Sequence, residues 1–330
     1  MPLKIFAVEG IGEVTTGDDI SGLLLDALDQ PLESGDVVLI TSKVVSKAAG
    51  LATHADKETL LGAETDRVVA QRGQTRIVRT HHGLTLAAAG IDASNIPLGQ
   101  IIPLPANPDH DAEEIRERIQ VLAKVDVAVI ITDTAGRAWR IGQTDIAIGA
   151  AGIAPHLDFS GVDDSYGNSL VVTSPAIADE IAGAADLVAG KLGGTPFVVV
   201  RGLPTQWLLE EPGPGASALI REEDGDLFGL GARDAVLVAA STSSCLRGFP
   251  QFDETSAEEL KAAALDGIDT NVADIRIVSN GHFEVYSPKR DLGASDWLAM
   301  GALAERTRIL ARAFRHSLVT TFRDQKLQQP

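Results

Sequence analysis

The chain has 330 residues, 45% of them hydrophobic, which is enough for two domains or one large domain with a substantial core. Its net charge of −18, from 28 Lys and Arg against 46 Asp and Glu, argues against a general nucleic-acid-binding protein, which needs a basic surface. The single cysteine, Cys245, excludes a disulfide framework within the chain, and no apolar run reaches the length of a membrane span. We therefore expect a globular cytoplasmic protein that binds neither nucleic acid nor membranes.

Strand-like and helix-like segments alternate along the first two thirds of the chain. Residues 3–8 alternate in polarity, and residues 36–41, 125–131 and 197–200 are continuous aliphatic runs, so all four segments are expected to be strands. Helical spacing or helix-start signals mark residues 19–28, 57–72, 111–122 and 174–189. This organisation predicts an α/β (α+β) fold.

A polar segment follows the expected buried strand at residues 125–131. Asp133 and Thr134 come directly after it, and Arg137 and Arg140 follow a short turn. Ligands of α/β proteins bind at the carboxyl ends of strands, where Asp133 and Thr134 could donate oxygens to a hard cation. The two arginines could bind a phosphate or a carboxylate. On the local pattern alone, a simple polar turn stabilised by its own aspartate is the alternative.

A second polar segment follows the expected strand at residues 36–41. It contains Ser42, Lys43 and Lys47, whose hydroxyl and ammonium groups could bind phosphate. The spacing differs from that of a P-loop, so this motif does not identify a nucleotide-binding fold by itself. A solvated basic turn is the alternative interpretation.

Two further loops contain possible ligand-binding groups. Asp92 follows a segment of small residues, with Ser94 and Asn95 close behind, and these side chains could bind a cation or a nucleotide. An Asx-turn would explain the same residues. The loop at residues 9–14 contains two glycines, so its backbone could approach a ligand closely, although this fragment alone favours a plain turn.

The composition changes near residue 248, and we expect a separate region from 249 to 330. A capping box predicts a helix at residues 256–265. An Asn-Gly pair between residues 275–278 and 282–286 predicts a hairpin, and a long amphipathic helix is expected at residues 295–322. The sequence therefore predicts a first domain at 1–248 and a helix-hairpin-helix extension of open role at 249–330.

Taken together, several motifs are similar to those of one known family. These are VEGIGEV, VVLITSKVVSKAAG, GIDASN, LPANPDHDAEEIRERI, ITDTAGRAWRIGQTDIAIGAAG, ADEIAGAADLVAGKL and FVVVRGL, which occur in this order between residues 3 and 246. This part of the chain resembles the coenzyme F420-0:L-glutamate ligase (F420:gamma-glutamyl ligase) family. The combination of these motifs is far more specific to the family than any one of them.

The resemblance implies a GTP-dependent ligase that forms an amide bond between L-glutamate and the deazaflavin precursor F420-0, followed by further γ-linked glutamates. It implies two divalent cations, Mg²⁺ or Mn²⁺, with K⁺ as an aid. It also implies a two-domain ligase fold that assembles into an intertwined homodimer in the cytoplasm.

Site residues follow from the same resemblance, position by position. One cation is expected at Asp92 and Asp133, and a second at Asp133 and Thr134. The expected GTP contacts are Ile11, Gly12, Glu13, Val14, Ser42, Lys43, Lys47 and Asn95. Asp92, Asp133 and Lys47 are the expected catalytic residues, with Lys47 neutralising charge on the transferred phosphoryl group.

Two features depart from the family pattern. Lys191 stands where some members have an acidic ligand of the second cation, and actinobacterial-type members have a similar lysine. Residues 249–330 are too short for the nitroreductase-like domain that follows in some of those members. Two alternatives therefore remain: a non-catalytic homologue that binds the nucleotide or deazaflavin, and an amide ligase for a different phosphorylated acceptor. The number of added glutamates stays open.

Overall fold

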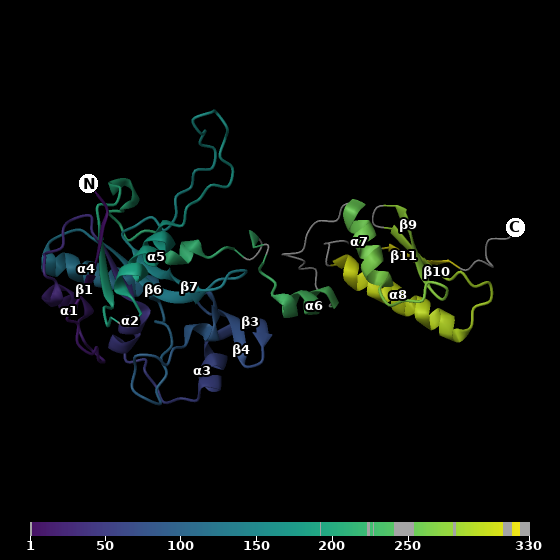
Figure 1. Cartoon of the computed structure of the whole chain (residues 1–330), viewed down its shortest axis with the longest axis horizontal. Helices are drawn as coiled ribbons and strands as arrows, with labels where there is room; N and C mark the ends of the chain where they lie inside the picture. The colour runs from purple at the N-terminus through teal and green to yellow at the C-terminus, as the bar shows by residue number, and fades with distance from the viewer. Residues whose placement is uncertain are drawn as a thin grey trace. The chain divides into compact units, whose positions relative to one another are not determined.

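The computed structural model describes residues 2–191, 193–222, 225–226, 228–240, 254–279, 282–312 and 319–323. The chain forms two compact units, Met1–Ile220 and Arg221–Pro330, which are described separately (Figure 1). The division between the units falls before residue 248, where we expect the ligase-like region to end. Compactness and sequence similarity define boundaries differently, so the expected end at 248 stays a prediction.

A five-stranded mixed sheet forms the centre of unit 1, in the order β1-β8-β2-β6-β7. Its strands are β1 (Lys4–Val8), β8 (Phe197–Arg201), β2 (Val37–Thr41), β6 (Ala128–Gly136) and β7 (Gln143–Ala151). Strands β2 and β6 are parallel, with Val37 opposite Ala128, and the other neighbours are antiparallel. This mixed sheet is consistent with the expected α+β class.

Helices cover the two faces of this sheet because alternate residues of its central strands point to opposite sides. Val38 and Ile40 of β2 pack in one core with α1 (Ile20–Ala27) and α4 (Pro108–Ala123). Val37 and Leu39 pack in the other core with α5 (Ile177–Ala189). Burial on both faces explains why these strands are continuous aliphatic runs.

The two polar segments next to the central strands differ from our expectations. The segment after β2 is a helix, α2 (Ser42–Ala48), and not a turn. Strand β6 continues to Gly136, so Asp133 and Thr134 lie within the strand and not beyond its end. The reason is β7, which pairs with β6 as far as Gly136 opposite Gln143. The sequence analysis did not predict this strand.

A smaller sheet of unit 1 contains β3 (Thr65–Arg72), β4 (Thr75–Thr80) and β5 (Thr85–Ala87) in that order. Helix α3 (Lys57–Glu64) precedes it, so the expected helix at 57–72 is wrong in its second half. Pairing of Thr65–Arg72 with β4 outweighs the helical pattern there. The short turn η1 (Ala88–Gly90) then leads to Asp92, and η2 (Thr205–Trp207) and η3 (Ala216–Leu219) follow β8.

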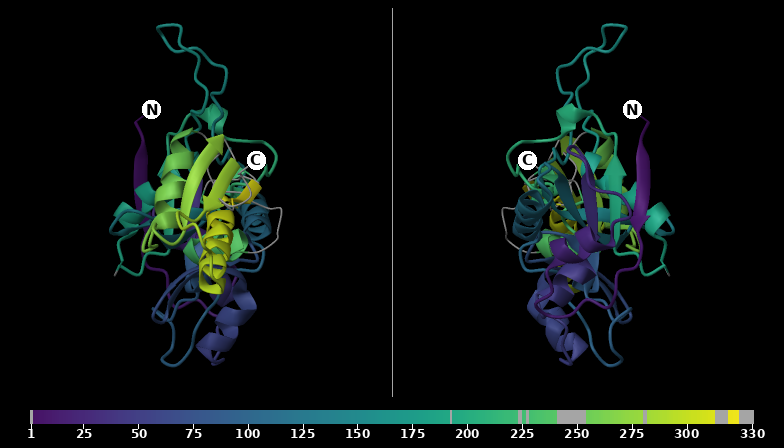
Figure 2. Two further views of the ribbon diagram at one scale, coloured as in Figure 1. Left: turned by 90° about the vertical axis from the view of Figure 1, so that its right-hand side faces the viewer. Right: turned by 90° about the vertical axis from the view of Figure 1, so that its left-hand side faces the viewer.

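Residues 157–175 form a long arm that extends away from the rest of unit 1, as all three views show (Figures 1 and 2). Its two sides are joined by backbone hydrogen bonds, such as Phe159 N–H to the Thr173 carbonyl at 3.0 Å. Tyr166, Val171 and Val172 on this arm are largely exposed. The arm is therefore an irregular hairpin with apolar side chains in solvent.

Unit 2 contains α6 (Ala232–Ala240), α7 (Glu254–Leu265), β9 (Asp274–Ser279), β10 (His282–Tyr286), α8 (Ala294–Arg312) and β11 (Val319–Arg323). The expected hairpin is present as β9 and β10, and Phe283 and Val285 pack with Leu260 of α7. The expected last helix is too long, because it ends at Arg312 and β11 then pairs parallel to β10. Cys245 lies outside the described residues.

Among the described residues, no helix combines the length and the apolarity that crossing a membrane requires.

Candidate functional site

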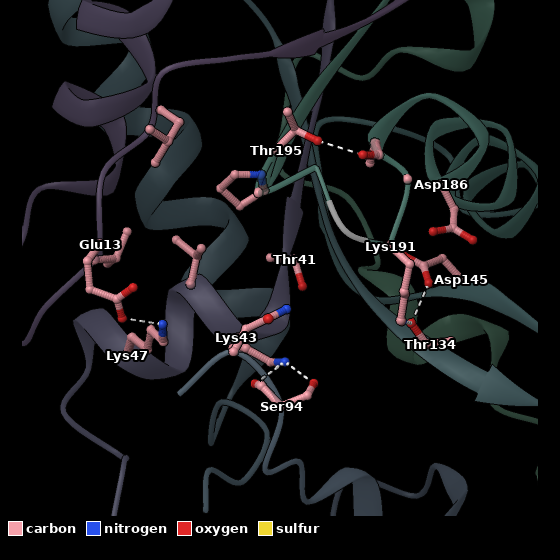
Figure 3. Close-up of a pocket in the computed structure, with 18 of the residues that line it drawn as sticks. Glu13, Thr41, Lys43, Lys47, Ser94, Thr134, Asp145, Asp186, Lys191 and Thr195 are labelled. Atoms are coloured by element: carbon pink, nitrogen blue, oxygen red, sulfur yellow. Dashed lines mark hydrogen bonds and ion pairs between the residues drawn. The ribbon is translucent and has the colours of Figure 1, made fainter. Parts of the chain in front are cut away.

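A cavity of about 420 Å³ lies in unit 1 where five segments of the chain meet (Figure 3). The loop after β1, helix α2, the Asp92 loop, the β6–β7 pair and the loop after α5 all contribute to its lining. The lining residues are Ile11, Gly12, Glu13, Val14, Thr41, Lys43, Val44, Lys47, Ser94, Asn95, Thr134, Asp145, Asp186, Ala189, Gly190, Lys191, Gly194, Thr195 and Pro196. Segments that are far apart in the sequence therefore form one polar cavity.

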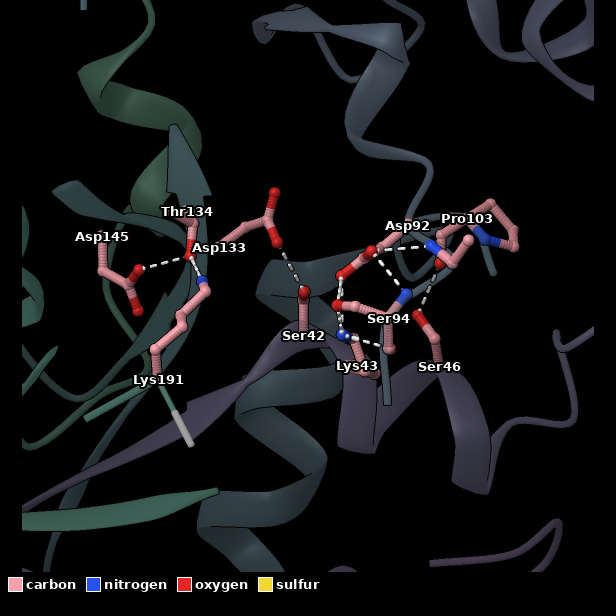
Figure 4. Close-up of polar contacts among 11 residues, drawn as sticks. Ser42, Lys43, Ser46, Asp92, Ser94, Pro103, Asp133, Thr134, Asp145 and Lys191 are labelled. Carbon is pink, nitrogen blue, oxygen red and sulfur yellow. Dashed lines mark hydrogen bonds and ion pairs between the residues drawn. The ribbon is translucent and has the colours of Figure 1, made fainter. Parts of the chain in front are cut away.

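Two lysines of α2 form the basic side of this cavity. Lys43 Nζ lies 2.6 Å from Asp92 Oδ2 and donates to the Ser94 carbonyl oxygen at 2.7 Å (Figure 4). Lys47 Nζ lies 2.5 Å from Glu13 Oε1. Helix α2 begins directly after strand β2, and these contacts orient its two ammonium groups. The basic side is thus built from a helix and not from a solvated turn.

Asp92 is held by its own loop as well as by Lys43. Its Oδ1 accepts the backbone N–H groups of Ala93 and Ser94 at 2.6 and 2.8 Å, so the Asx-turn exists. Partial burial raises the pKa of Asp92, but hydrogen bonds from Lys43 and Ser94 outweigh burial and lower the pKa to about 2. This carboxylate is therefore ionised at neutral pH, and the turn orients it toward α2.

Asp133 is the most perturbed carboxylate of the site. It is largely buried, and its Oδ1 accepts the hydroxyl of Ser42 at 3.1 Å (Figure 4). Burial raises the pKa of Asp133 to about 6, against the hydrogen bond from Ser42, and the negative charges of Asp145 and Asp92 raise it further. A cation at a buried carboxylate that also feels two other negative charges would be stabilised.

Asp145 on β7 is a site residue that the sequence analysis missed. It lies opposite Thr134 in the strand register and accepts the Thr134 hydroxyl at 2.8 Å. Lys191 Nζ donates to the same threonine oxygen at 2.9 Å (Figure 4). Burial raises the pKa of Asp145, and the nearby charge of Asp186 also raises it while Lys191 lowers it. The weak alternation at residues 145–148 was the signal in the sequence that could have indicated this strand.

The structure gathers most of the expected site residues. Those that line the cavity are Ile11, Gly12, Glu13, Val14, Lys43, Lys47, Asn95 and Thr134. Ser42, Asp92 and Asp133 lie immediately beside it, bonded to each other or to lining residues. Arg137 and Arg140 are not among the lining residues and lie in the loop between β6 and β7.

The donor set at Asp133 fits a small oxygen-binding cation. Within the described ranges, no three His, Cys, Asp or Glu side chains come together as a complete metal site. Mg²⁺ needs no such cluster, because it commonly binds one or two carboxylates and completes its shell with water and substrate phosphates. Asp133 and Asp92 can supply those carboxylates.

Fold and site together define an α/β protein whose cavity has lysines on one side and carboxylates and hydroxyls on the other, a combination suited to a phosphorylated ligand. Residues 51–202 match the family model described as F420-0:Gamma-glutamyl ligase. Coenzyme F420:L-glutamate ligase of Methanothermobacter thermautotrophicus is 36% identical over 253 residues, which covers 69% of this chain and 99% of the relative. The protein of the same name from Methanopyrus kandleri is 37% identical over 248 residues, covering 68% and 97%. The chain belongs to the F420-0:gamma-glutamyl ligase family.

Proposed function

We propose that this protein joins L-glutamate to coenzyme F420-0 in a GTP-dependent ligation and then adds further γ-linked glutamates, as part of coenzyme F420 biosynthesis. The observation that supports this best is the cavity itself. It combines the loop after β1, the lysines of α2 and Asn95, which are the segments where the family resemblance predicts GTP. The names of the relatives support the choice of L-glutamate, and the description of the family model supports F420-0.

GTP is proposed to bind along the basic side of the cavity. The backbone of the Ile11–Val14 segment and the Asn95 side chain would contact the nucleotide, and Ser42 would orient Asp133 from the start of α2. Lys43 and Lys47 supply positive charge for the phosphates, with Asp92 and Glu13 holding the two ammonium groups in place. Lys47 would stabilise the charge that develops during phosphoryl transfer.

Asp133 and Asp92 would hold the first divalent cation, Mg²⁺ or Mn²⁺, and Asp133 with Thr134 the second. Such a cation, when bound, neutralises phosphate charge and polarises the phosphoryl group. Lys191 donates to Thr134, so the second position has a lysine where a further acidic ligand would otherwise strengthen it. We also propose K⁺ as an aid, on the family resemblance alone.

The proposed reaction has two steps, phosphoryl transfer to a carboxylate and then attack by an amine. A carboxylate oxygen of F420-0 attacks the γ-phosphorus of GTP, giving an acyl phosphate and releasing GDP. The glutamate amine then attacks the acyl carbon, losing a proton as the amide bond forms and phosphate leaves. The lysines of α2 bind the phosphates through both steps and hold the reacting groups close together.

A homodimer in the cytoplasm is proposed for the working form. The arm at residues 157–175 exposes Tyr166, Val171 and Val172, and an isolated hairpin is marginally stable alone in water. A second copy that covers this arm would bury those side chains. Light scattering on the wild type and on Val171→Ser should give a dimer and a weakened dimer, and a monomeric wild type would refute this assembly.

The function is tested with purified protein, GTP, Mn²⁺, L-glutamate and F420-0. We expect a mass increase of one glutamyl unit in F420-0, matched by release of GDP and phosphate. Tight GTP binding without turnover would instead identify a non-catalytic homologue. Turnover restricted to another phosphorylated acceptor, in a parallel screen by mass spectrometry, would identify a different amide ligase.

A further inference from the structure

The loop between β6 and β7, residues 137–142, exposes an aromatic side chain beside two guanidinium groups. Trp139 is 91% exposed and Ile141 is 100% exposed. Arg137 and Arg140, on either side of the tryptophan, are exposed as well. These side chains belong to no hydrophobic core formed by the described residues. The fold therefore gives no reason for an apolar and basic patch at this place, and such patches mark binding surfaces.

The backbone of Trp139 is in a conformation that side chains rarely adopt. Its φ angle is +64°, in the left-handed region, where residues with a β-carbon are uncommon and a bulky aromatic residue is strained. A loop under no functional constraint would adopt an unstrained φ angle at this position. Strained residues of this kind cluster at ligand-binding segments, so the angle agrees with a binding role for the exposed indole.

The two arginines have positive charge available for a ligand. Arg137 donates one hydrogen bond across the loop to the Ile141 carbonyl oxygen at 2.9 Å. In the part of the chain that the structure describes, neither Arg137 nor Arg140 forms a salt bridge, although other arginines such as Arg201 do. In a chain of net charge −18, these guanidinium groups favour an anionic partner such as a phosphodiester.

The loop is connected to the cavity by the two strands that flank it. Thr134 and Asp145, which line the cavity, lie opposite each other in the register of β6 and β7. Two residue pairs further along, Gly136 faces Gln143 and the loop begins. At about 3.3 Å per residue, the loop starts roughly 7 Å from the cavity-lining pair. A ligand that extends out of the cavity along this hairpin would reach Trp139.

We propose that residues 137–142 bind the acceptor outside the cavity, with Trp139 stacked on a flat heteroaromatic ring and Arg140, with Arg137, paired to a phosphodiester. The inference rests on the proposed function and assigns the acceptor's binding surface within it. F420-0 has its reactive carboxylate on a lactyl-phosphate side chain of the deazaflavin. When that carboxylate reaches the γ-phosphate of GTP in the cavity, the ring lies outside, where the exposed indole is available for stacking.

Calorimetric titration of the full-length protein with F420-0, without GTP or glutamate, tests this binding surface. Trp139→Ala should raise the Kd for F420-0 about tenfold, as expected for the loss of one aromatic stack, and Trp139→Phe should restore most of the affinity. Arg140→Met should raise the Kd several-fold and reduce its dependence on salt. The matched control is Phe228→Ala, which removes an exposed aromatic ring from unit 2 and should leave the Kd unchanged.

A glycine variant separates ligand contact from damage to the fold. Glycine adopts positive φ without strain, so Trp139→Gly should raise the midpoint of thermal unfolding while it weakens F420-0 binding as much as Trp139→Ala does. In all these variants the Kd for GTP should stay within about twofold of the wild-type value, because residues 137–142 do not line the cavity. A parallel loss of GTP binding would overturn the assignment.

Three outcomes separate the binding of F420-0 by residues 137–142 from the ligase activity itself. If the wild type glutamylates F420-0 and Trp139→Ala has an unchanged Kd and KM for F420-0, the function stands and the inference is overturned. If Trp139→Ala dissociates an oligomer in light scattering while F420-0 binding is unchanged, the loop contacts a second copy and the inference is again overturned. If the wild type neither binds nor glutamylates F420-0, the proposed function fails first.

Discussion

Ser42 and Asp133 are 91 positions apart in the chain, and a 3.1 Å hydrogen bond from the Ser42 hydroxyl to Asp133 Oδ1 joins them. The bond links the first residue of α2 to the middle of β6, the strand that lies parallel to β2. It is a neutral donor to a largely buried carboxylate, so it only partly offsets the cost of ionising Asp133. In the absence of a cation, the negative charge of ionised Asp133 therefore destabilises the folded protein.

The first prediction concerns Asp133→Asn in the metal-free protein. The folded-state pKa is raised from 3.8 to about 6, so ionised Asp133 destabilises the fold at pH 8 by up to roughly 3 kcal/mol. Stability is lost as pH rises from about 4 through 6, because the folded state keeps the Asp133 proton to a higher pH than the unfolded state does. Asp133→Asn should therefore increase the free energy of unfolding at pH 8 and change it little at pH 4. Urea unfolding at both values measures this difference.

Asp19→Asn is the control of opposite sign. The hydrogen bond from Arg118 lowers the pKa of Asp19, so its ionised form stabilises the fold at neutral pH and that stabilisation is lost as pH falls below about 4. Asp19→Asn should be less stable than the wild type at pH 8. A stabilising effect of both substitutions at pH 8 would contradict the electrostatic explanation for Asp133.

The fold could be predicted where local pattern and burial agree. Strands β2 and β8 have apolar runs at Val37–Ile40 and Phe197–Val200 because both faces are buried, and these runs predict the strands. Strand β7 has an exposed polar start at Gln143 and small residues later, so its alternation is weak. Local spacing predicts helix for the residues of β3 and β11, because their strand conformation depends on pairing with β4 and β10.

The candidate site was only partly visible for a similar reason. Lys43 and Lys47 follow a clear strand, and the family resemblance pointed to them as well. Asp145 acquires its position from the register of β6 and β7, which places it opposite Thr134. Lys191 reaches the same threonine from a loop 57 positions away. Such contacts are set by tertiary structure. The family resemblance placed Lys191 near the second cation, but no motif predicts Asp145.

The second prediction separates the two partners in the ion pair of Lys47 and Glu13. Lys47→Met should weaken GTP binding at least tenfold, because a hydrogen bond to a charged group contributes roughly 1.5–3 kcal/mol. Glu13→Gln leaves the ammonium without its counter-charge and should keep or improve the affinity for GTP. The pair is partly exposed, so both variants should unfold within a few degrees of the wild type. Calorimetric GTP titration distinguishes them, and equal losses of affinity would show that the pair acts only as a structural unit.

The third prediction addresses Lys191 and the proposed second cation. Lys191 Nζ donates to the Thr134 hydroxyl at 2.9 Å, and its charge lowers the pKa of Asp145. The positive charge of Lys191 therefore competes with a cation at Thr134. Lys191→Glu should increase the amount of Mn²⁺ bound per chain in the presence of GDP, because a carboxylate adds an oxygen ligand. Lys191→Met removes the charge without adding a ligand and should give a smaller increase. Electron paramagnetic resonance counts free Mn²⁺, and identical stoichiometry in all three proteins would refute competition at this position.

The last prediction tests the packing of α4 against β7, at the contact between Pro108 and Gly149. A β-carbon at Gly149 would collide with the backbone carbonyl of Pro108 at the start of α4, and backbone cannot move aside as a flexible side chain can. Gly149→Ala should therefore destabilise unit 1 by about 2–3 kcal/mol, as expected for overpacking in a well-packed core. Gly136→Ala is the matched control, because a β-carbon there meets nothing within 4 Å although the residue lies in the adjacent strand. Chemical unfolding should show a lower midpoint for Gly149→Ala alone, and equal midpoints for the two variants would show that α4 shifts without cost.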